Sequence, residues 1–440
     1  MEKLLRYKSH FFAVIGFIVL ALLYFHPVIQ GKQILQNDIV QYTGMAKEMN
    51  DFRAEFNEES YWNNSVFGGM PTYQLGAKYP HNYIKQLDSV IRFLPRPADY
   101  LFLYFIGFYI LLVSLKIPSL KAFIGALLFG FSTYLIIIIG AGHNAKAHAI
   151  AYMPLLVAGV LMVFQKRYWL GAIVTFLAAA LEIQANHFQM TYYLLFLLII
   201  IALYFTIEAF KKKEVKEWGI SILLLLVSAV LAVGVNATSL LATSEYTEFS
   251  TRSNSELTTN ADGSLKTDTN AMSHEYITEY SYGIFETLNL VSSKITGGAN
   301  NENIGTDSNT YQFVYNFLSS NGYDPSQALQ FAEHAPTYWG AQPIVAAPAY
   351  IGAIVVFLAI LGLFIEKRKI KYIFAIGALV SIVLSWGKYF PLTDLLIDIL
   401  PLYNKFRAVA SIQVIAELCI PVLAVMGLYS YFQSTKEEQF

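Results

Sequence analysis

Cysteine is nearly absent from this sequence: among 440 residues only Cys419 carries a thiol. One cysteine cannot form a disulfide framework or a cysteine metal cluster within the chain. Charge is also scarce, because Asp, Glu, Lys and Arg together supply 14% of the residues, against about 25% in a typical soluble domain. The formal net charge is −1, so no overall basic bias points to nucleic acid. We therefore expect no nucleic-acid partner.

Several motifs are missing as well. The sequence has neither a Walker-type phosphate loop nor a glycine-rich dinucleotide turn, which argues against ATP-driven transport and redox chemistry. No repeat with a period of about 20–50 residues is visible, which argues against a solenoid. Hydrophobic residues dominate instead, at 55% of the chain. This composition predicts a protein whose solvent is the lipid bilayer.

Apolar windows long enough for a bilayer core about 30 Å thick recur along the chain. They lie near residues 11–29, 99–116, 119–140, 147–164, 168–186, 189–210, 217–241, 344–365, 371–387 and 408–432. We predict an all-α polytopic membrane protein with about ten transmembrane helices, built as a single membrane domain over residues 1–440. The first window is too long for a signal-peptide core, so we expect a retained helix. No interruption is evident within the predicted spans.

Basic residues gather in the short connections between these windows. They are Lys116, Lys121, Lys166, Arg167, Lys211 to Lys213, Lys216, Lys367 to Lys369 and Lys371. The positive-inside bias places these connections and the amino terminus in the cytoplasm. Two long polar loops, residues 30–98 and 242–343, and a shorter one, residues 388–407, then lie outside. In the second loop we expect a mobile stretch over residues 247–270, followed by short helices.

Two residues of the first outer loop suit carbohydrate chemistry. Asp38 follows closely after the first predicted helix, so its carboxylate is expected near the outer membrane surface. There it can act as a general base toward a hydroxyl group or hold a divalent cation. The alternative is a solvated aspartate or a helix N-cap. Trp62 offers a ring on which a sugar face can stack, or else an ordinary interfacial anchor.

The turn between the third and fourth predicted helices carries His143, Lys146 and His148. A cation and two imidazoles at the membrane surface suit the phosphate group of a lipid carrier. One alternative is that these residues only cap the hairpin. Another is a metal site, although no third ligand is adjacent in the sequence.

Polar residues at the ends of other predicted helices extend this set. Glu182 lies at the membrane boundary, where a carboxylate is costly unless it is functional or paired. Glu182 and His187 are predicted to line a polar site. The alternative is that they lie at a solvated helix end and have no function there. Lys405 and Arg407 precede the last predicted helix and suit either phosphate binding or interfacial anchoring. Glu417, within that helix, needs a partner.

Six segments, taken in their order along the chain, resemble the bacterial YfhO family of membrane proteins. They are Asp38, residues 62–71, residues 142–144, residues 186–189, residues 338–343 and residues 404–407. The resemblance covers nearly the whole chain. Members of that family are longer, so this chain is expected to be either a short member of the family or a fragment of a longer protein. The family is similar to GT-C glycosyltransferases, which take a sugar from a polyprenyl-phosphate carrier and transfer it outside the cytoplasmic membrane.

The resemblance implies a GT-C-like fold and an inverting hexosyl transferase in the bacterial cytoplasmic membrane. In the GT-C pattern an acidic residue in the first outer loop is central to catalysis, and Asp38 is the matching position, with Glu182 the next candidate. Many such enzymes carry two acidic residues there, whereas Asn37 precedes Asp38 here, which leaves a divalent cation an open question. The implied partners are a polyprenyl-phosphate-linked sugar, membrane lipids and an envelope glycan or lipid acceptor. Substrate binding is expected at Trp62, His143, Lys146, His148, His187, Lys405 and Arg407.

Two other functions fit the same sequence. A transporter or flippase for lipid-linked glycans would also place polar residues near helix ends, but it should show interrupted helices and internal repeats. A non-catalytic envelope assembly factor predicts that Asp38 is dispensable. Convergence of Asp38, the 143–148 turn and Arg407 on one outward-facing site would favour the transferase.

Overall fold

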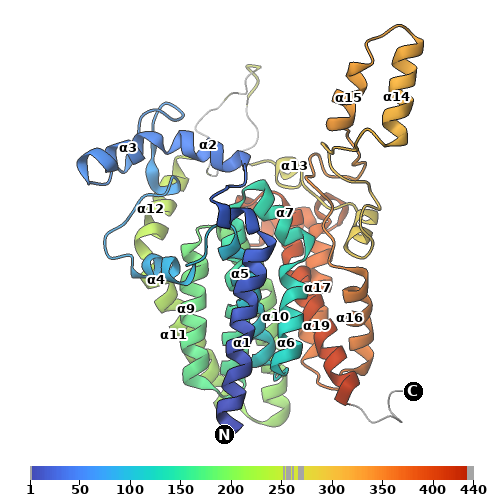
Figure 1. Ribbon diagram of the computed structural model, residues 1–440. Coiled ribbons are helices and arrows are strands. Elements are labelled where there is room, and N and C mark those ends of the chain that lie inside the picture. The colour runs from blue at the N-terminus through green and yellow to red at the C-terminus, as the bar shows by residue number, and fades with distance from the viewer. Residues whose placement is uncertain (1, 251–252, 254–258, 260–261, 266–271, 434–440) are drawn as a thin grey trace.

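The computed structural model describes residues 2–250, 253, 259, 262–265 and 272–433. Long helices stand side by side and run through a bundle (Figure 1). They are α1 (Glu2–Tyr24), α5 (Ala98–Ser114), α6 (Ser119–Gly130), α7 (Thr133–Ala141), α8 (Asn144–Phe164), α9 (Tyr168–Gln184), α10 (Phe188–Lys212), α11 (Val215–Val235), α16 (Ala353–Ile365), α17 (Lys371–Ser385) and α19 (Val414–Gln433). The start of α1 and the end of α19 lie at the same end of the bundle, which we call the terminal end.

Shorter elements gather at the opposite end, which we call the loop end (Figure 1). The first is η1 (His26–Gln30), at the end of the first predicted window. From the first predicted loop come α2 (Asn37–Met45), α3 (Lys47–Phe56), the hairpin strands β1 (Trp62–Asn63) and β2 (Met70–Pro71), η2 (Thr72–Gln74) and α4 (Tyr83–Ile91). The others are α12 (Ala237–Glu248), α13 (His274–Ile277), η3 (Phe285–Leu290), α14 (Asn309–Ser320), α15 (Ser326–Glu333), η4 (Gly387–Tyr389), α18 (Thr393–Ile399), η5 (Tyr403–Lys405) and η6 (Val409–Gln413). Most of the predicted mobile stretch, residues 247–270, lies outside the described residues.

Within the described residues, four helices are long and apolar enough to cross a membrane. They are Asn144–Phe164, Phe188–Lys212, Val215–Val235 and Val409–Gln433, the last made of η6 and α19 together. The pair α6 and α7 gives a fifth crossing if it is taken as one span. The remaining apolar helices of the bundle are shorter. The prediction of a helical chain with membrane-crossing helices is therefore confirmed, whereas the number of about ten crossings stays a prediction.

The bundle is built around α8 and α19. Both are almost wholly buried, while the outward sides of α10 and α11 expose many apolar side chains, as expected of helices that face lipid. Small residues allow the closest contacts: a Cβ atom at Gly159 of α8 would lie 2.6 Å from the Thr175 nitrogen of α9. A Cβ atom at Gly362 of α16 would lie 2.6 Å from the Leu423 carbonyl oxygen of α19. Such contacts are typical of helices that pack within membranes.

One predicted span is bent. The sequence window at residues 119–140 shows no interruption, but the structure divides it into α6 and α7, whose axes differ by 49°. The break falls at Phe131 and Ser132, and the Ser132 hydroxyl donates a hydrogen bond to the buried Glu417 carboxylate of α19. The expectation of uninterrupted helices is therefore wrong. A contact between residues far apart in the sequence accompanies the bend, so the local pattern of apolar residues did not reveal it.

Candidate functional site

The amino-terminal turn of α2 packs against the turn that joins α7 to α8. The buried Gln36 side chain, just before α2, donates a hydrogen bond to the Ile139 carbonyl of α7 and accepts one from Asn144 of α8, at 3.4 Å. Gly142 has φ of +92°, and a Cβ atom there would lie 3.3 Å from the Cβ of Asp38. Only glycine permits both this backbone conformation and this close approach easily. Asp38 is therefore held beside the start of α8.

The Asp38 carboxylate contacts the imidazole of His143, the residue that precedes α8. Oδ2 of Asp38 lies 2.9 Å from Nδ1 of His143, and the two side chains are 51% and 53% exposed. Partial burial and the nearby charge of Lys146 lower the pKa of His143, although Asp38 acts in the opposite direction. Because a carboxylate only accepts hydrogen bonds, Nδ1 carries the hydrogen in this contact. The arrangement is a carboxylate oriented by an imidazole and open to solvent.

Lys146 and His187 lie next to this pair. The Lys146 ammonium donates a hydrogen bond of 2.8 Å to Ser411 of η6 and lies 5.6 Å from the centre of the Tyr134 ring. His187 precedes α10, and burial, followed by the charge of Lys146, lowers its pKa to about 4. Its Nδ1 is buried and has no hydrogen-bond partner among the described residues. Lys146 is therefore a fixed cation beside a neutral imidazole.

Arg407 approaches the same region from the segment before η6. Its carbonyl oxygen accepts a hydrogen bond of 2.6 Å from Gln189 in the first turn of α10. Its guanidinium group donates to the Tyr276 hydroxyl and lies 5.0 Å from the centre of that ring. Lys405, the last residue of η5, is two positions earlier in the chain. The structure thus brings Asp38, His143, Lys146, His187 and the Arg407 backbone to one part of the loop end.

Two predicted residues lie apart from this group. Trp62 belongs to the hairpin of β1 and β2, where its indole nitrogen donates to Asn64 at 3.1 Å. A Cβ atom at Gly69 would lie 2.6 Å from the Trp62 ring, so the ring covers the hairpin turn. Glu182 is completely buried in α9, and neither carboxylate oxygen has a hydrogen-bond partner among the described residues. No described contact joins either residue to Asp38.

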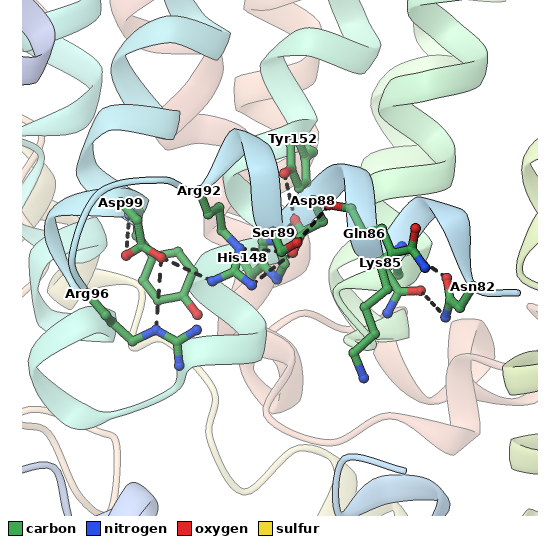
Figure 2. Close-up of polar contacts among 12 residues, drawn as sticks. Asn82, Lys85, Gln86, Asp88, Ser89, Arg92, Arg96, Asp99, His148 and Tyr152 are labelled. Carbon is green, nitrogen blue, oxygen red and sulfur yellow. Dashed lines mark hydrogen bonds and ion pairs between the residues drawn. The ribbon is translucent and has the colours of Figure 1, made fainter. Parts of the chain in front are cut away.

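His148 lies in a second, buried cluster. The Asp88 carboxylate of α4 accepts hydrogen bonds from His148 at 2.6 Å and from Tyr152 at 2.8 Å, both residues of α8. Arg92 lies 2.8 Å from Asp88 and 3.0 Å from Asp99, so it bridges the two carboxylates (Figure 2). Burial acts to raise the pKa of Asp88, but His148 and Arg92 outweigh it and lower that pKa to about 2. Asp88 is therefore an ionised anchor between α4 and α8.

A cavity of about 280 Å³ lies beside this cluster. Its polar lining includes Lys85, Asp88, Arg92 and His148. The sequence did not predict this cavity, since residues 30–98 were expected to form a polar loop. One feature of the sequence does indicate the cluster: Asp88 and Arg92 are four residues apart, so they lie on the same face of a helix and can form an ion pair.

Metal ligands do not gather at either cluster. Within the part of the chain that the structure describes, no three His, Cys, Asp or Glu side chains come together in a possible metal site. A divalent cation beside Asp38 would therefore need further ligands from a substrate or from water. The cation stays an expectation.

No protein-family model, no curated protein and no solved structure matches this chain. The resemblance to the YfhO family therefore stays a prediction.

Proposed function

We propose that the chain is a membrane-embedded glycosyltransferase that moves a sugar from a polyprenyl-phosphate carrier to a hydroxyl group of an envelope acceptor. The observation that carries this proposal is the half-exposed Asp38 carboxylate, held by His143 and flanked by the fixed cation of Lys146. A base, an electrostatic partner for phosphate and an open approach from solvent are the parts that such a transfer needs.

In the proposed step, an acceptor hydroxyl oxygen attacks the anomeric carbon of the donor sugar. The bond between that carbon and the phosphate oxygen breaks, and its electron pair leaves with the carrier phosphate. Asp38 takes the hydroxyl proton, most directly on Oδ1, while His143 holds Oδ2. Attack from the face opposite the phosphate inverts the anomeric centre, so no covalent enzyme intermediate is needed.

Charge stabilisation is assigned to Lys146 and Arg407. A phosphate leaving group gains negative charge in the transition state and needs a cation more than a proton. Lys146 meets that need without large movement, because Ser411 and the Tyr134 ring already fix its ammonium. The Arg407 guanidinium lies over the Tyr276 ring. A change of rotamer would let it bind a phosphate through two hydrogen bonds, as arginine commonly does. Lys405 adds a second cation on the same segment.

The finer topology belongs to the same proposal. We assign ten crossings, with α6 and α7 forming one, and place the loop end outside the bacterial cytoplasmic membrane. The shorter apolar helices α1, α5, α9, α16 and α17 then supply five of the crossings. Cysteines introduced at the exposed positions Ser65 and Ser319 should react with an impermeant thiol reagent in intact cells, and one at Lys212 should not. Protection of both loop-end positions would reverse the orientation.

Replacement of Asp38 by Asn tests the chemistry. The amide keeps the size of the carboxylate but loses its basicity, so transfer from a labelled polyprenyl-phosphate sugar should fall by about 10²–10⁴. Asp51→Asn is the matched control, because Asp51 is an exposed carboxylate of the neighbouring α3, paired only with Lys47. Purified protein in lipid, with an extract of envelope acceptors, provides the assay. Transfer by Asp38→Asn above about a tenth of the parent rate would refute the role of Asp38.

One observation favours a second function, a transporter or flippase for lipid-linked glycans. Ser132, at the bend between α6 and α7, donates a hydrogen bond to the buried Glu417 carboxylate, and Gln413 of η6 donates a second one at 3.1 Å. Interrupted helices around a buried polar group are typical of transporters. In that case Asp38→Asn would still move lipid-linked glycan across vesicle membranes, and the parent would never release carrier phosphate.

A further inference from the structure

The cavity beside Asp88 forms a second polar site at the loop end. Its walls come from α4 and the segment before it, from the end of α9 and the turn that follows, from His148 of α8 and from Ser239 of α12. Neither Asp38 nor His143 lines it, so it is separate from the proposed catalytic group. We propose that this cavity binds a phosphate monoester or diester, with Lys85 and Tyr79 as its main ligands.

The charges around the cavity favour an anion. Asp88 already accepts hydrogen bonds from His148, Tyr152 and Arg92, so its charge is compensated inside the cluster. Arg92 is likewise shared between Asp88 and Asp99. The cluster therefore presents little unbalanced negative charge to a ligand. The ammonium group of Lys85 is the remaining charged group on the cavity wall that such a ligand can bind.

Lys85 extends away from the Asp88 cluster (Figure 2). Its ammonium makes one described hydrogen bond, to the Ala77 carbonyl at 3.5 Å, which is the long limit for such a bond. Burial lowers the pKa of Lys85, and the charges of Lys78 and Arg53 lower it further, while Glu59 and Asp88 act in the opposite direction. A bound anion would compensate the charge of the partly buried ammonium group. The position thus suits a ligand with a concentrated negative charge, such as a phosphate.

Tyr79 supplies a donor that the protein itself does not use. Its hydroxyl is buried and has no hydrogen-bond partner among the described residues. A buried hydroxyl without a partner is costly, so a ligand oxygen there would satisfy it. The amide side chains of the wall are already fixed, since Asn82 donates to Gln184 at 2.9 Å and Asn186 donates to Gln74 at 2.9 Å. The cavity is therefore formed in advance of binding.

The volume of the cavity limits the ligand. About 280 Å³ is near the lower end for small-molecule pockets. It accommodates a phosphoester with a small attached group and excludes an oligosaccharide. The phosphate could belong to a lipid head group at the membrane surface or to a soluble phosphoester, and the two sources share the chemistry that Lys85 and Tyr79 recognise.

The test is thermal unfolding of the full-length protein in detergent, with increasing inorganic phosphate, glycerol phosphate or polyprenyl phosphate. Binding to the folded state raises the unfolding temperature with ligand concentration. Stabilisation by the soluble probes identifies a soluble phosphoester, and stabilisation by polyprenyl phosphate alone identifies a lipid head group. Chloride at equal ionic strength is the control for salt. If no phosphate probe stabilises the protein more than chloride does, the proposal is wrong.

Variants assign the effect to the cavity. Lys85→Met should weaken the apparent affinity by about 10- to 100-fold, as expected for a lost charged hydrogen bond, whereas Lys85→Arg should retain binding. Lys78→Met is the matched control, since it removes the same charge from the neighbouring loop without altering the cavity lining.

Should Lys85→Met fail to fold, Tyr79→Phe removes only an unused hydroxyl and should weaken binding by about 2- to 10-fold. Stabilisation that survives Lys85→Met but is lost in Lys146→Met would place the phosphate at the Asp38 group and overturn the proposal.

Discussion

Asp38 and Asp88 are both aspartates of the loop end that contact a histidine at the start of α8. Asp38 meets His143 at 2.9 Å and is about half exposed. Asp88 meets His148 at 2.6 Å, is almost completely buried and also accepts from Tyr152 and Arg92. The two carboxylates thus share a histidine contact but differ in exposure and in the number of donors.

This difference separates an anchor from a reactive group. A carboxylate surrounded by donors is stabilised as an anion, so it is a weak base and holds its neighbours in place. A carboxylate with one donor and access to solvent keeps an oxygen available to a substrate. By this argument Asp88 fixes α4 against α8, whereas Asp38 fits the role of base in the proposed transfer. Each prediction below tests that division.

The largest expected effect on stability is that of Asp88→Ala. Removal of the carboxylate leaves the partly buried Arg92 and the buried His148 without their main acceptor. Breaking a buried ion pair in this way typically costs about 3–5 kcal/mol. Thermal unfolding in detergent should show a large loss of stability for Asp88→Ala, and Asp38→Asn should unfold at nearly the parent temperature. Equal losses in the two variants would remove the distinction between anchor and reactive group.

The sequence predicted the helices better than the clusters. Hydrophobic runs determine helices locally, so each predicted window contains most of a bundle helix, although the window 344–365 begins well before α16 and the window 217–241 runs past the end of α11 into α12. The sequence placed Asp38 and His143 on the same side of the predicted membrane, because both residues flank helix ends, but it left open whether they meet. His148 was grouped with His143 as part of one turn, yet residues 144–148 already belong to α8. Five residues of helix rotate a side chain by about 140°, which turns His148 toward Asp88.

Other features depend on tertiary contacts that a local pattern does not contain. The bend at Ser132 accompanies its hydrogen bond to Glu417, 285 residues later in the chain. Glu417 was expected to need a partner, and its partners are Ser132 and Gln413. The cavity beside Lys85 is assembled from α4, α8, α9 and α12. The spacing of Asp88 and Arg92 marks one wall of it, but the other walls come from segments far apart in the sequence.

Acid should destabilise the Asp88 anchor. The pKa of Asp88 is lowered from 3.8 to about 2 in the folded protein, so the charged form stabilises the fold. That stabilisation is fully present above about pH 4 and is lost as the pH falls toward 2. The shift corresponds to about 2 kcal/mol. The unfolding temperature of the parent should therefore drop between pH 4 and 2, and Asp88→Asn should show a smaller drop over that interval. An identical acid profile in the variant would show that other groups control it.

Glu182 is a third carboxylate, with neither solvent nor a hydrogen-bond partner among the described residues. An unsatisfied buried polar group typically costs about 1–3 kcal/mol. Glu182→Leu should therefore raise thermal stability by about this amount without lowering sugar transfer. Glu182→Gln, which keeps the shape but not the acid, is the companion variant. Loss of transfer in both variants would restore the catalytic role that the sequence suggested for Glu182.

His143→Gln should have the smallest effect on the fold. The pair with Asp38 is about half exposed, and such pairs contribute about 0.2–1 kcal/mol to stability. Gln can donate an amide hydrogen to Asp38 in place of Nδ1, so the carboxylate should keep its orientation and transfer should fall by less than about tenfold, the equivalent of one neutral hydrogen bond. The rate and the unfolding temperature are measured side by side with those of Asp38→Asn. If His143→Gln lost transfer as completely as Asp38→Asn while remaining folded, the imidazole would be the proton acceptor and Asp38 the residue that orients it.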